Sequence, residues 1–178
     1  MEEQILESEA LRQSQEEQGG DRKQLILFRQ GNEHYALLID QIKEVVMTPH
    51  ITQLPQTPSY IKGVANIRGN IITLFDLEEK FELKREEEVV STSKSGSYTL
   101  VVENDQLKIG ILVKEVPDTL SVPVSALDDS LNISQDEGED NYIMGIVKSE
   151  GRLIILIDVL KVFSEQDLNM AAARAKRQ

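Results

Sequence analysis

The sequence contains no cysteine and no tryptophan, and its 178 residues include only four phenylalanines, four tyrosines and two histidines. Without cysteine the chain forms neither a disulfide framework nor a thiolate metal site, and it has no thiol nucleophile. Small-ligand and oligosaccharide-binding barrels generally use stacking aromatic side chains, so the lack of tryptophan argues against that class. The core must be built from valine, isoleucine and leucine, which suits short, curved strands.

Basic residues are also scarce, since 19 Lys and Arg face 31 Asp and Glu, for a net charge of −12. This charge disfavours binding to nucleic-acid phosphates and to anionic lipid. No apolar run reaches the roughly 18–20 residues that span a bilayer. The sequence does not show the basic start and following apolar stretch that would indicate a signal peptide. We therefore expect a cytoplasmic protein with no nucleic-acid partner and no direct membrane contact.

Signatures of catalysis are equally sparse. His34 falls in an exposed-looking turn and His50 in a proline-rich loop, and neither has a Ser or Asp partner at a recognisable spacing. The sequence has no glycine-rich phosphate loop. Asp76 and Asp158 precede two similar short helical segments, which favours helix capping over a catalytic pair. We expect no enzymatic activity, no cofactor and no metal site.

What the chain does contain is an internal repeat. Residues 61–81 align with residues 143–163 without a gap. The identical pairs are Ile61/Ile143, Gly63/Gly145, Gly69/Gly151, Ile72/Ile154, Leu74/Leu156, Asp76/Asp158 and Phe81/Phe163. Internal self-similarity indicates repeated architecture, so we expect two related subdomains.

Each copy of the repeat predicts a glycine hairpin followed by a short capped helix. In the first copy, strands at 60–67 and 71–75 flank a tight turn in which Gly69 supplies a positive φ. An earlier hairpin around residues 24–39 is echoed around residues 98–113. About five short strands in each half favour closure into a small barrel, because closure removes exposed edges.

These patterns divide the chain into segments. Residues 1–22 form an acidic arm that we expect to be disordered, and residues 23–164 form the folded part. The first barrel is expected at roughly 23–81 and the second at roughly 98–164, joined by a charged, Ser-rich linker at 82–97, with strands able to exchange between the barrels. Residues 165–178 form a C-terminal helix and tail, whose start Ser164 and Asp167 cap as a capping box.

The cleft between the two halves is the expected binding groove. Its apolar candidates are Ile42, Val45 and Val46 on one side and Val113, Val116 and Leu120 on the other. For any single one of them, ordinary core packing is the stronger alternative. Arg68 stands apart, because it occupies a hairpin tip where the other copy has Glu150. It is either a solvated turn residue or a planar, multi-donor anchor at a protein interface.

The segment from Tyr60 to Ile72, read with Phe75, Asp76 and Leu77, resembles the signature of the CheW-like chemotaxis coupling proteins. The Tyr35 strand, the Thr57-Pro58 pair and the segment 109–113 are similar to that family too, so the resemblance covers about 24–164. It implies a mainly β fold of two pseudo-symmetric five-stranded SH3-like barrels, with short helices and a C-terminal helix. Thr73 departs from the pattern, because the family often has proline there.

The resemblance also implies a function. Such proteins are non-enzymatic adaptors that couple the signalling tip of chemoreceptors (methyl-accepting chemotaxis proteins) to the regulatory domain of the chemotaxis histidine kinase CheA. The receptor tip would dock between the barrels, and the kinase domain would join barrel to barrel. The coupling positions that match are Ile42, Glu44, Gly63, Arg68 and Val116, to which we add Val45 and Val113 as groove candidates. The alternatives are an accessory adaptor of a non-flagellar chemosensory pathway and a small-ligand-binding barrel.

Overall fold

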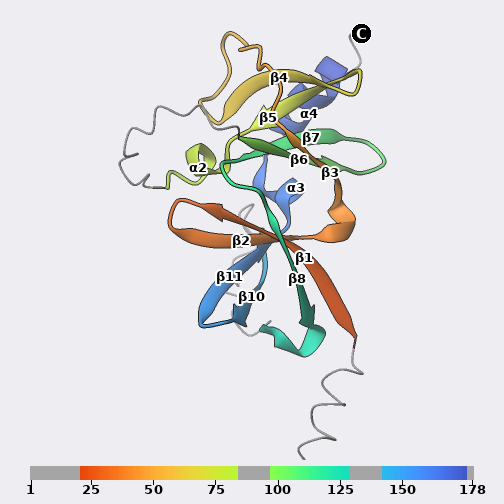
Figure 1. Cartoon of the computed structure of the whole chain (residues 1–178). Helices are drawn as coiled ribbons and strands as arrows, with labels where there is room; N and C mark the ends of the chain where they lie inside the picture. Colours follow the sequence, from red (N-terminus) through yellow and green to blue (C-terminus); the bar gives the residue numbers. More distant parts are fainter. Residues whose placement is uncertain (1–20, 84–96, 129–141, 176–178) are drawn as a thin grey trace, which may run out of the picture.

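A computed structural model describes residues 21–83, 97–128 and 142–175 of the chain. The acidic arm, most of the linker and the end of the tail lie outside the described residues. Figure 1 shows a five-stranded sheet above a six-stranded sheet, with α3 between them. The predicted fold class, mainly β with short helices and a C-terminal helix, is confirmed.

The strands fall into two mixed sheets. The six-stranded sheet has the order β8-β1-β2-β11-β10-β9 and the five-stranded sheet the order β3-β6-β7-β5-β4. The first contains β1 (Arg22–Gln30), β2 (Glu33–Leu38), β8 (Asp118–Pro123), β9 (Leu127–Asp128), β10 (Ile143–Ser149) and β11 (Arg152–Ile157). The second contains β3 (Ile42–Met47), β4 (Ile61–Ile67), β5 (Asn70–Phe75), β6 (Tyr98–Glu103) and β7 (Lys108–Val113). The helices are α2 (Leu77–Lys80), α3 (Val159–Val162) and α4 (Glu165–Ala175), with 3-10 turns η1 (Ile39–Gln41) and η2 (Val124–Ala126).

The two halves of the sequence exchange their first hairpins. The β1–β2 hairpin pairs with β8 and β11 from the second half, whereas the β6–β7 hairpin pairs with β3 and β5 from the first. Each exchange is made through a parallel contact, Leu156 opposite Ala36 in one sheet and Leu74 opposite Gly110 in the other. Each sheet therefore takes strands from both halves, so the strand exchange that was expected alongside the divisions at about 23–81 and 98–164 crosses those divisions.

The glycine hairpins turn as the sequence predicts. Gly69 has φ of 85° and Gly151 has φ of 75°, which confirms the positive φ expected at Gly69. The residues before them, Arg68 and Glu150, are also left-handed, with φ of 52° and 51°. Two consecutive positive φ values define the turn type that matches the twist of a two-residue hairpin. A side chain in this region costs roughly 1–2 kcal/mol, so both tips carry some backbone strain.

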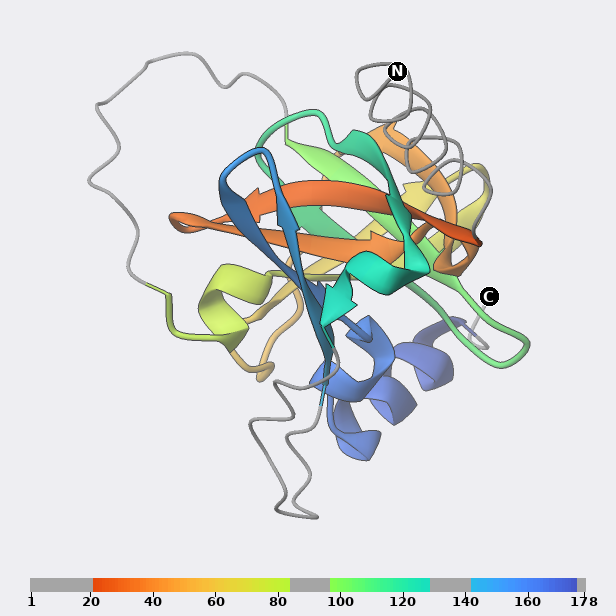
Figure 2. The same cartoon turned by 90° about the horizontal axis from the view of Figure 1, so that it is seen from below.

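The predicted helix caps are present. Oδ1 of Asp76 accepts from the backbone N of Glu78 at 2.9 Å, and Oδ1 of Asp158 accepts from the N of Leu160 at 3.2 Å. At the start of α4, Ser164 and Asp167 exchange reciprocal side-chain-to-backbone bonds of 3.2 and 3.1 Å, as the capping box requires. Figure 2 shows the C-terminal helices, in blue, gathered on one flank of the sheets.

Buried side chains form three clusters. Leu25, Leu27, Val122, Val147, Ile154 and Leu156 fill the six-stranded sheet, and Ala65, Ile67, Ile72, Leu74 and Val101 fill the five-stranded one. Each cluster joins opposite edges of its sheet, so each sheet closes on itself. The third and largest cluster lies between the sheets and includes Phe28, Leu37, Phe75, Ile111, Ile157 and Phe163. The space between the halves is therefore largely packed core.

Candidate partner-binding surface

An ion pair closes the five-stranded sheet at the tip of its glycine hairpin. Nε of Arg68 donates to Oε2 of Glu44 at 2.6 Å. The Arg68 side chain is 74 % exposed and that of Glu44 only 17 %. Glu44 lies on β3 and Arg68 follows β4, which are opposite edges of this sheet. Two residues matched separately by the family resemblance are therefore brought together.

The pair leaves most of the guanidinium available. Within the described part of the chain, Glu44 is the one side chain bonded to Arg68. A guanidinium has five N–H donors in a planar fork, so four remain for a partner's carboxylate, carbonyl or aromatic ring. Glu44 fixes the Nε side of the group, which reduces the side-chain entropy that binding would cost.

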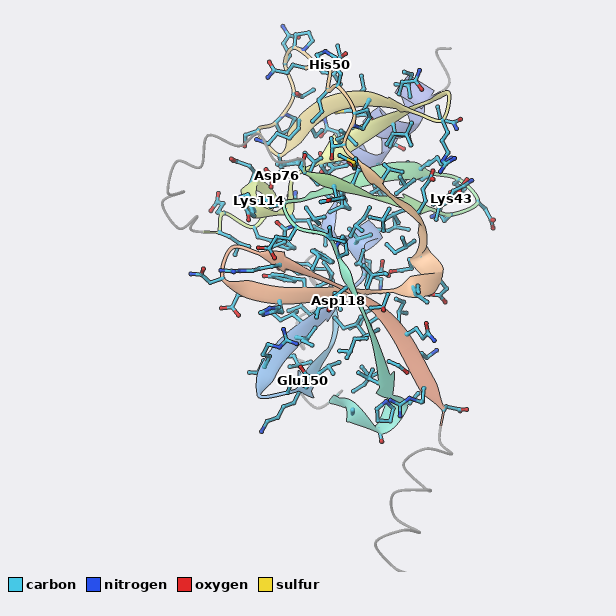
Figure 3. The ribbon with its side chains drawn as sticks, in the orientation of Figure 1. Lys43, His50, Asp76, Lys114, Asp118 and Glu150 are labelled. Carbon is cyan, nitrogen blue, oxygen red and sulfur yellow. The ribbon has the colours of Figure 1, made fainter. Side chains whose placement is uncertain are left out.

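The matching corner of the six-stranded sheet has the opposite electrostatics. Glu44 lies opposite Val101 in the β3–β6 ladder, and Asp118 lies opposite Leu27 in the corresponding β8–β1 ladder. The equivalents of the Arg68–Glu44 pair are therefore Glu150 and Asp118, both acidic (Figure 3). Glu150 is 78 % exposed and lies 3.3 Å from its neighbour Arg152. The position of the cation Arg68 is thus taken by an acid in the other half, and that acid is paired with Arg152.

An apolar strip follows the outer side of β3. Val45 is 39 % exposed and Met47 is 70 % exposed, and both lie outward on alternate positions. Their equivalents on β8 are the polar residues Thr119 and Ser121. Sequence reasoning identified Val45 but missed Met47, which the period-two alternation along this strand would have found.

Charges beside the strip are paired. Lys43 Nζ lies 3.0 Å from Oε2 of Glu103 on the neighbouring strand β6. The side-chain hydrogen bond between them is the main cause that raises the pKa of Lys43 and lowers the pKa of Glu103. Both groups therefore stay charged at neutral pH, and Lys43 contributes no net positive field to the strip.

Ile42 and Val116 occupy equivalent places on the two connections that cross between the sheets. Ile42 opens β3 and packs partly against the central core. Val116 precedes β8 and is 67 % exposed. It borders a hollow of about 170 Å³ that Asp118 and Arg152 also line.

Two of the predicted coupling residues have structural roles instead of exposed side chains. Val113 is 2 % exposed and packs in the cluster between the sheets, so the prediction that it lines an open groove is wrong. Gly63 has φ of 139°, and a Cβ there would lie 2.2 Å from the carbonyl O of Thr52. The fold itself requires glycine at this bulge, whatever Gly63 contributes to binding.

Within the described ranges, no group of three or more His, Asp or Glu side chains is arranged to hold a metal ion. No helix of the described residues is long and apolar enough to cross a membrane. The exposed features of the described surface include Arg68, the apolar strip on β3 and Val116. The two sheets, with their exchanged hairpins, define the class of the protein as a double barrel.

Comparison with known proteins gives the family. The sequence model of the CheW-like domain matches residues 24–167, and the chain belongs to the CheW-like family. The chemotaxis protein CheW of Helicobacter pylori is 31% identical over 159 residues, covering 89% of this chain and 92% of that protein. Protein PilI of Pseudomonas aeruginosa is 30% identical over 109 residues, covering 58% of this chain and 56% of that protein.

A solved structure supports the same assignment. The crystal structure of the scaffolding protein TtCheW from Thermoanaerobacter tengcongensis superposes with a TM-score of 0.67 at 28% sequence identity. The superposition covers 81% of this chain and 89% of that one. The likeness therefore extends over both barrels.

Proposed function

We propose that the chain is an adaptor that couples chemoreceptors to the chemotaxis histidine kinase. The observation that carries this proposal is the broken symmetry at the hairpin tips. Arg68 is prepositioned by Glu44 in one barrel, while Glu150 and Asp118 occupy the equivalent corner of the other. Arg68 is 74 % exposed, and an ion pair with so exposed a partner adds little to stability, which favours a role in binding.

We assign the kinase contact to the Arg68 end of the molecule. The kinase regulatory domain, a relative of this fold, would meet the barrel end to end and accept hydrogen bonds from the exposed guanidinium. The electrostatic complement it must offer is a carboxylate or a set of carbonyl groups. Glu150 at the other hairpin tip would offer a second contact of opposite charge, shared with its neighbour Arg152.

We assign the receptor contact to the apolar strip on β3 and to Ile42 and Val116 at the crossings. A helical hairpin presents apolar residues at helical spacing, which suits an exposed apolar strip rimmed by paired charges. The core fills the space between the sheets, so this contact would be made on the surface of the crossings rather than inside a deep groove. Signal transfer would then be a bias on kinase conformation through contacts, without chemistry on the adaptor.

The test is a direct binding assay with purified components. A receptor signalling-tip fragment and a kinase regulatory domain are each titrated against the full chain at low and moderate salt. We expect both partners to bind. The Arg68→Ala variant should lose more affinity for the kinase domain than for the receptor fragment. Binding to neither partner at either salt would exclude the coupling function.

An accessory adaptor of a non-flagellar pathway is the second candidate, and the similarity to Protein PilI is the observation that favours it. The two candidates differ in which kinase is the partner. Competing the regulatory domains of the source organism's chemosensory kinases for this chain separates them. A small-ligand barrel is the less supported alternative, because such sites generally use stacking aromatic side chains and the chain has no tryptophan.

A further inference from the structure

A buried carboxylate joins the two sheets on one side of the molecule. Glu78, the second residue of α2, is 6 % exposed. Its Oε1 accepts a hydrogen bond from the backbone N of Gly31 at 3.0 Å, and its Oε2 lies 3.3 Å from Nζ of Lys114. Gly31 lies in the β1–β2 turn of the six-stranded sheet, whereas α2 and Lys114 follow strands of the five-stranded sheet. Figure 3 shows Lys114 near the start of α2, where Asp76 is labelled.

A second polar contact lies next to the first. Gln30, at the end of β1, is 2 % exposed, and its Nε2 donates to the carbonyl O of Leu112 on β7 at 3.2 Å. The hairpin tip of one sheet is therefore held by the other sheet at two adjacent residues. We call the contacts of Gln30 and Gly31 with Leu112, Glu78 and Lys114 the clasp.

The repeat itself does not require the clasp. Leu160 occupies the place of Glu78 in the second half. The β6–β7 turn, which corresponds to the β1–β2 turn, is bonded locally: Oδ1 of Asn104 accepts from the backbone N of Gln106 and of Leu107, each at 2.8 Å. In the second half, a turn that is bonded within itself and an apolar residue in the helix take the place of the clasp. The charged clasp is therefore an addition specific to one side of the molecule.

The clasp grips the crossing that carries Val116. Leu112 is held through its carbonyl at the end of β7, and Lys114 is held by the Glu78 carboxylate. Val116 follows two positions later with 67 % of its surface exposed. Val116 lies between this held segment and the β8 ladder, which begins with Asp118 opposite Leu27, so the clasp fixes the chain before Val116 and the ladder fixes it afterwards.

We propose that Glu78 is a positioning residue, which holds the 112–116 crossing in place so that Val116 is presented in a fixed position to a partner. The inference rests on the proposed function in taking the chemoreceptor tip as that partner. A segment ordered beforehand loses less entropy on binding, so the clasp raises affinity without touching the partner.

Glu78→Gln separates positioning from folding. The glutamine keeps the shape and an oxygen that accepts from Gly31, but it removes the charge that attracts Lys114. Lys114→Gln removes the same ion pair from its half-exposed side, where the side chain is 53 % exposed. The control is Glu79→Gln, the same change one residue further along α2, where the carboxylate lies 3.8 Å from Lys62 instead.

The experiment measures amide hydrogen exchange of the full-length chain together with receptor-tip affinity. In Glu78→Gln and in Lys114→Gln we expect about tenfold faster exchange over residues 112–118, because loss of the ion pair lowers the local opening free energy. Exchange over the β4–β5 hairpin should not change. Affinity for the receptor fragment should fall about threefold to fivefold, and the double variant should lose no more than either single one.

Several results would overturn the proposal. Unchanged exchange over 112–118 in both variants shows that the clasp does not hold the crossing. Faster exchange with unchanged receptor affinity shows that holding it does not position the site. An equal effect of Glu79→Gln shows that helix charge, rather than the clasp, is responsible. If the wild-type chain binds no receptor fragment, the coupling function fails, yet the exchange data still decide whether Glu78 orders the crossing.

Discussion

The two sheets have similar strand arrangements but expose different side chains. Five strands of each sheet correspond in order, and β9 is an extra strand at the edge of the six-stranded sheet. Both glycine hairpins carry a register shift at the same place, Ile61/Gly63 and Ile143/Gly145. These matched positions lie in the ladders, the turns and the helix caps. The repeat therefore specifies what each sheet needs in order to fold.

The unmatched positions lie mostly where the chain meets solvent or where the two sheets meet. Arg68 pairs with Glu44 in one half, whereas the equivalent residues of the other half, Glu150 and Asp118, are both acidic. Apolar Val45 and Met47 on β3 replace polar residues of β8. Exposed differences cost little stability and so are free to serve partners. Each prediction below compares a residue of one half with a control chosen for its contrasting environment.

The largest effect is expected at Gly63. Alanine there would place Cβ 2.2 Å from the Thr52 carbonyl at a φ of 139°, a contact that needs backbone movement. We expect Gly63→Ala to destabilise the fold by about 3 kcal/mol or more, measured by urea unfolding.

Gly69→Ala is the matched control for Gly63→Ala. It also has a positive φ, of 85°, but a Cβ there meets nothing within 4 Å. We expect it to cost about 1 kcal/mol. Equal losses for the two variants would mean that strain alone, without the close approach of Thr52, explains the glycine at position 63.

Arg68→Ala should change binding much more than folding. Arg68 is 74 % exposed, and an ion pair with so exposed a partner contributes about 0–1 kcal/mol, so the melting temperature should hardly move. Affinity for the kinase regulatory domain should fall about tenfold or more, as for an interface anchor. Calorimetric titration beside thermal melts gives both numbers.

Glu150→Ala tests the asymmetry directly, since Glu150 has the same backbone conformation at the other hairpin tip. It should leave the kinase contact at Arg68 unaffected. If Arg68→Ala unfolds the protein, or if the two variants weaken the same contact equally, then the charge difference between the tips does not select the partner.

The sequence predicted the repeated parts well because they depend on local chemistry. The Gly69 turn, the Asp76 and Asp158 caps and the Ser164–Asp167 box each follow from residues a few positions apart. Positions of charge were also visible, since Arg68 stands against Glu150 in the alignment of the copies.

What the sequence could not predict are contacts between distant segments. The sequence allowed strands to exchange between the barrels but did not decide whether they do, because symmetric hairpins fit either partner sheet and only the global packing chooses. The Arg68–Glu44 bond, the burial of Val113 and the clasp at Glu78 all depend on that choice. Met47 is different, because strand alternation alone would have revealed its exposure.

Tyr60 links the five-stranded sheet to the C-terminal helix α4 through a hydrogen bond. Its hydroxyl donates to Oδ1 of Asp167 at 2.7 Å, and Asp167 is 3 % exposed. Burial, followed by this hydrogen bond, raises the pKa of Tyr60 from 10.0 to about 12. We expect Tyr60→Phe to cost about 1–2 kcal/mol near neutral pH, because a buried carboxylate loses a donor.

The stabilisation by Tyr60 depends on pH in a definite direction. Because the pKa of Tyr60 is higher in the folded state than in the unfolded state, its contribution to stability is fully present below pH 10 and is lost as the pH rises toward about 12. Urea unfolding at pH 8 and at pH 11.5 should therefore show the wild type approaching the variant. Ionisation of Tyr35, whose pKa burial also raises, affects both proteins alike. A stability difference that is constant with pH would exclude the hydrogen bond as its cause.

The smallest expected effect is a gain in stability, at Thr73, where the two copies of the repeat differ by one buried hydroxyl. Thr73 is 3 % exposed, and its Oγ1 has no hydrogen-bond partner among the described residues, whereas the equivalent residue in the other half is Ile155. Thr73→Val removes an unpaired buried hydroxyl at nearly constant volume, so we expect stabilisation of about 1 kcal/mol in urea unfolding. Thr99→Val is the matched control, because the equally buried Thr99 shares a 2.9 Å bond with Thr48 and should lose stability. If both valine variants shift in the same direction, hydroxyl pairing does not distinguish these sites, and Thr73 is then retained for a reason other than packing.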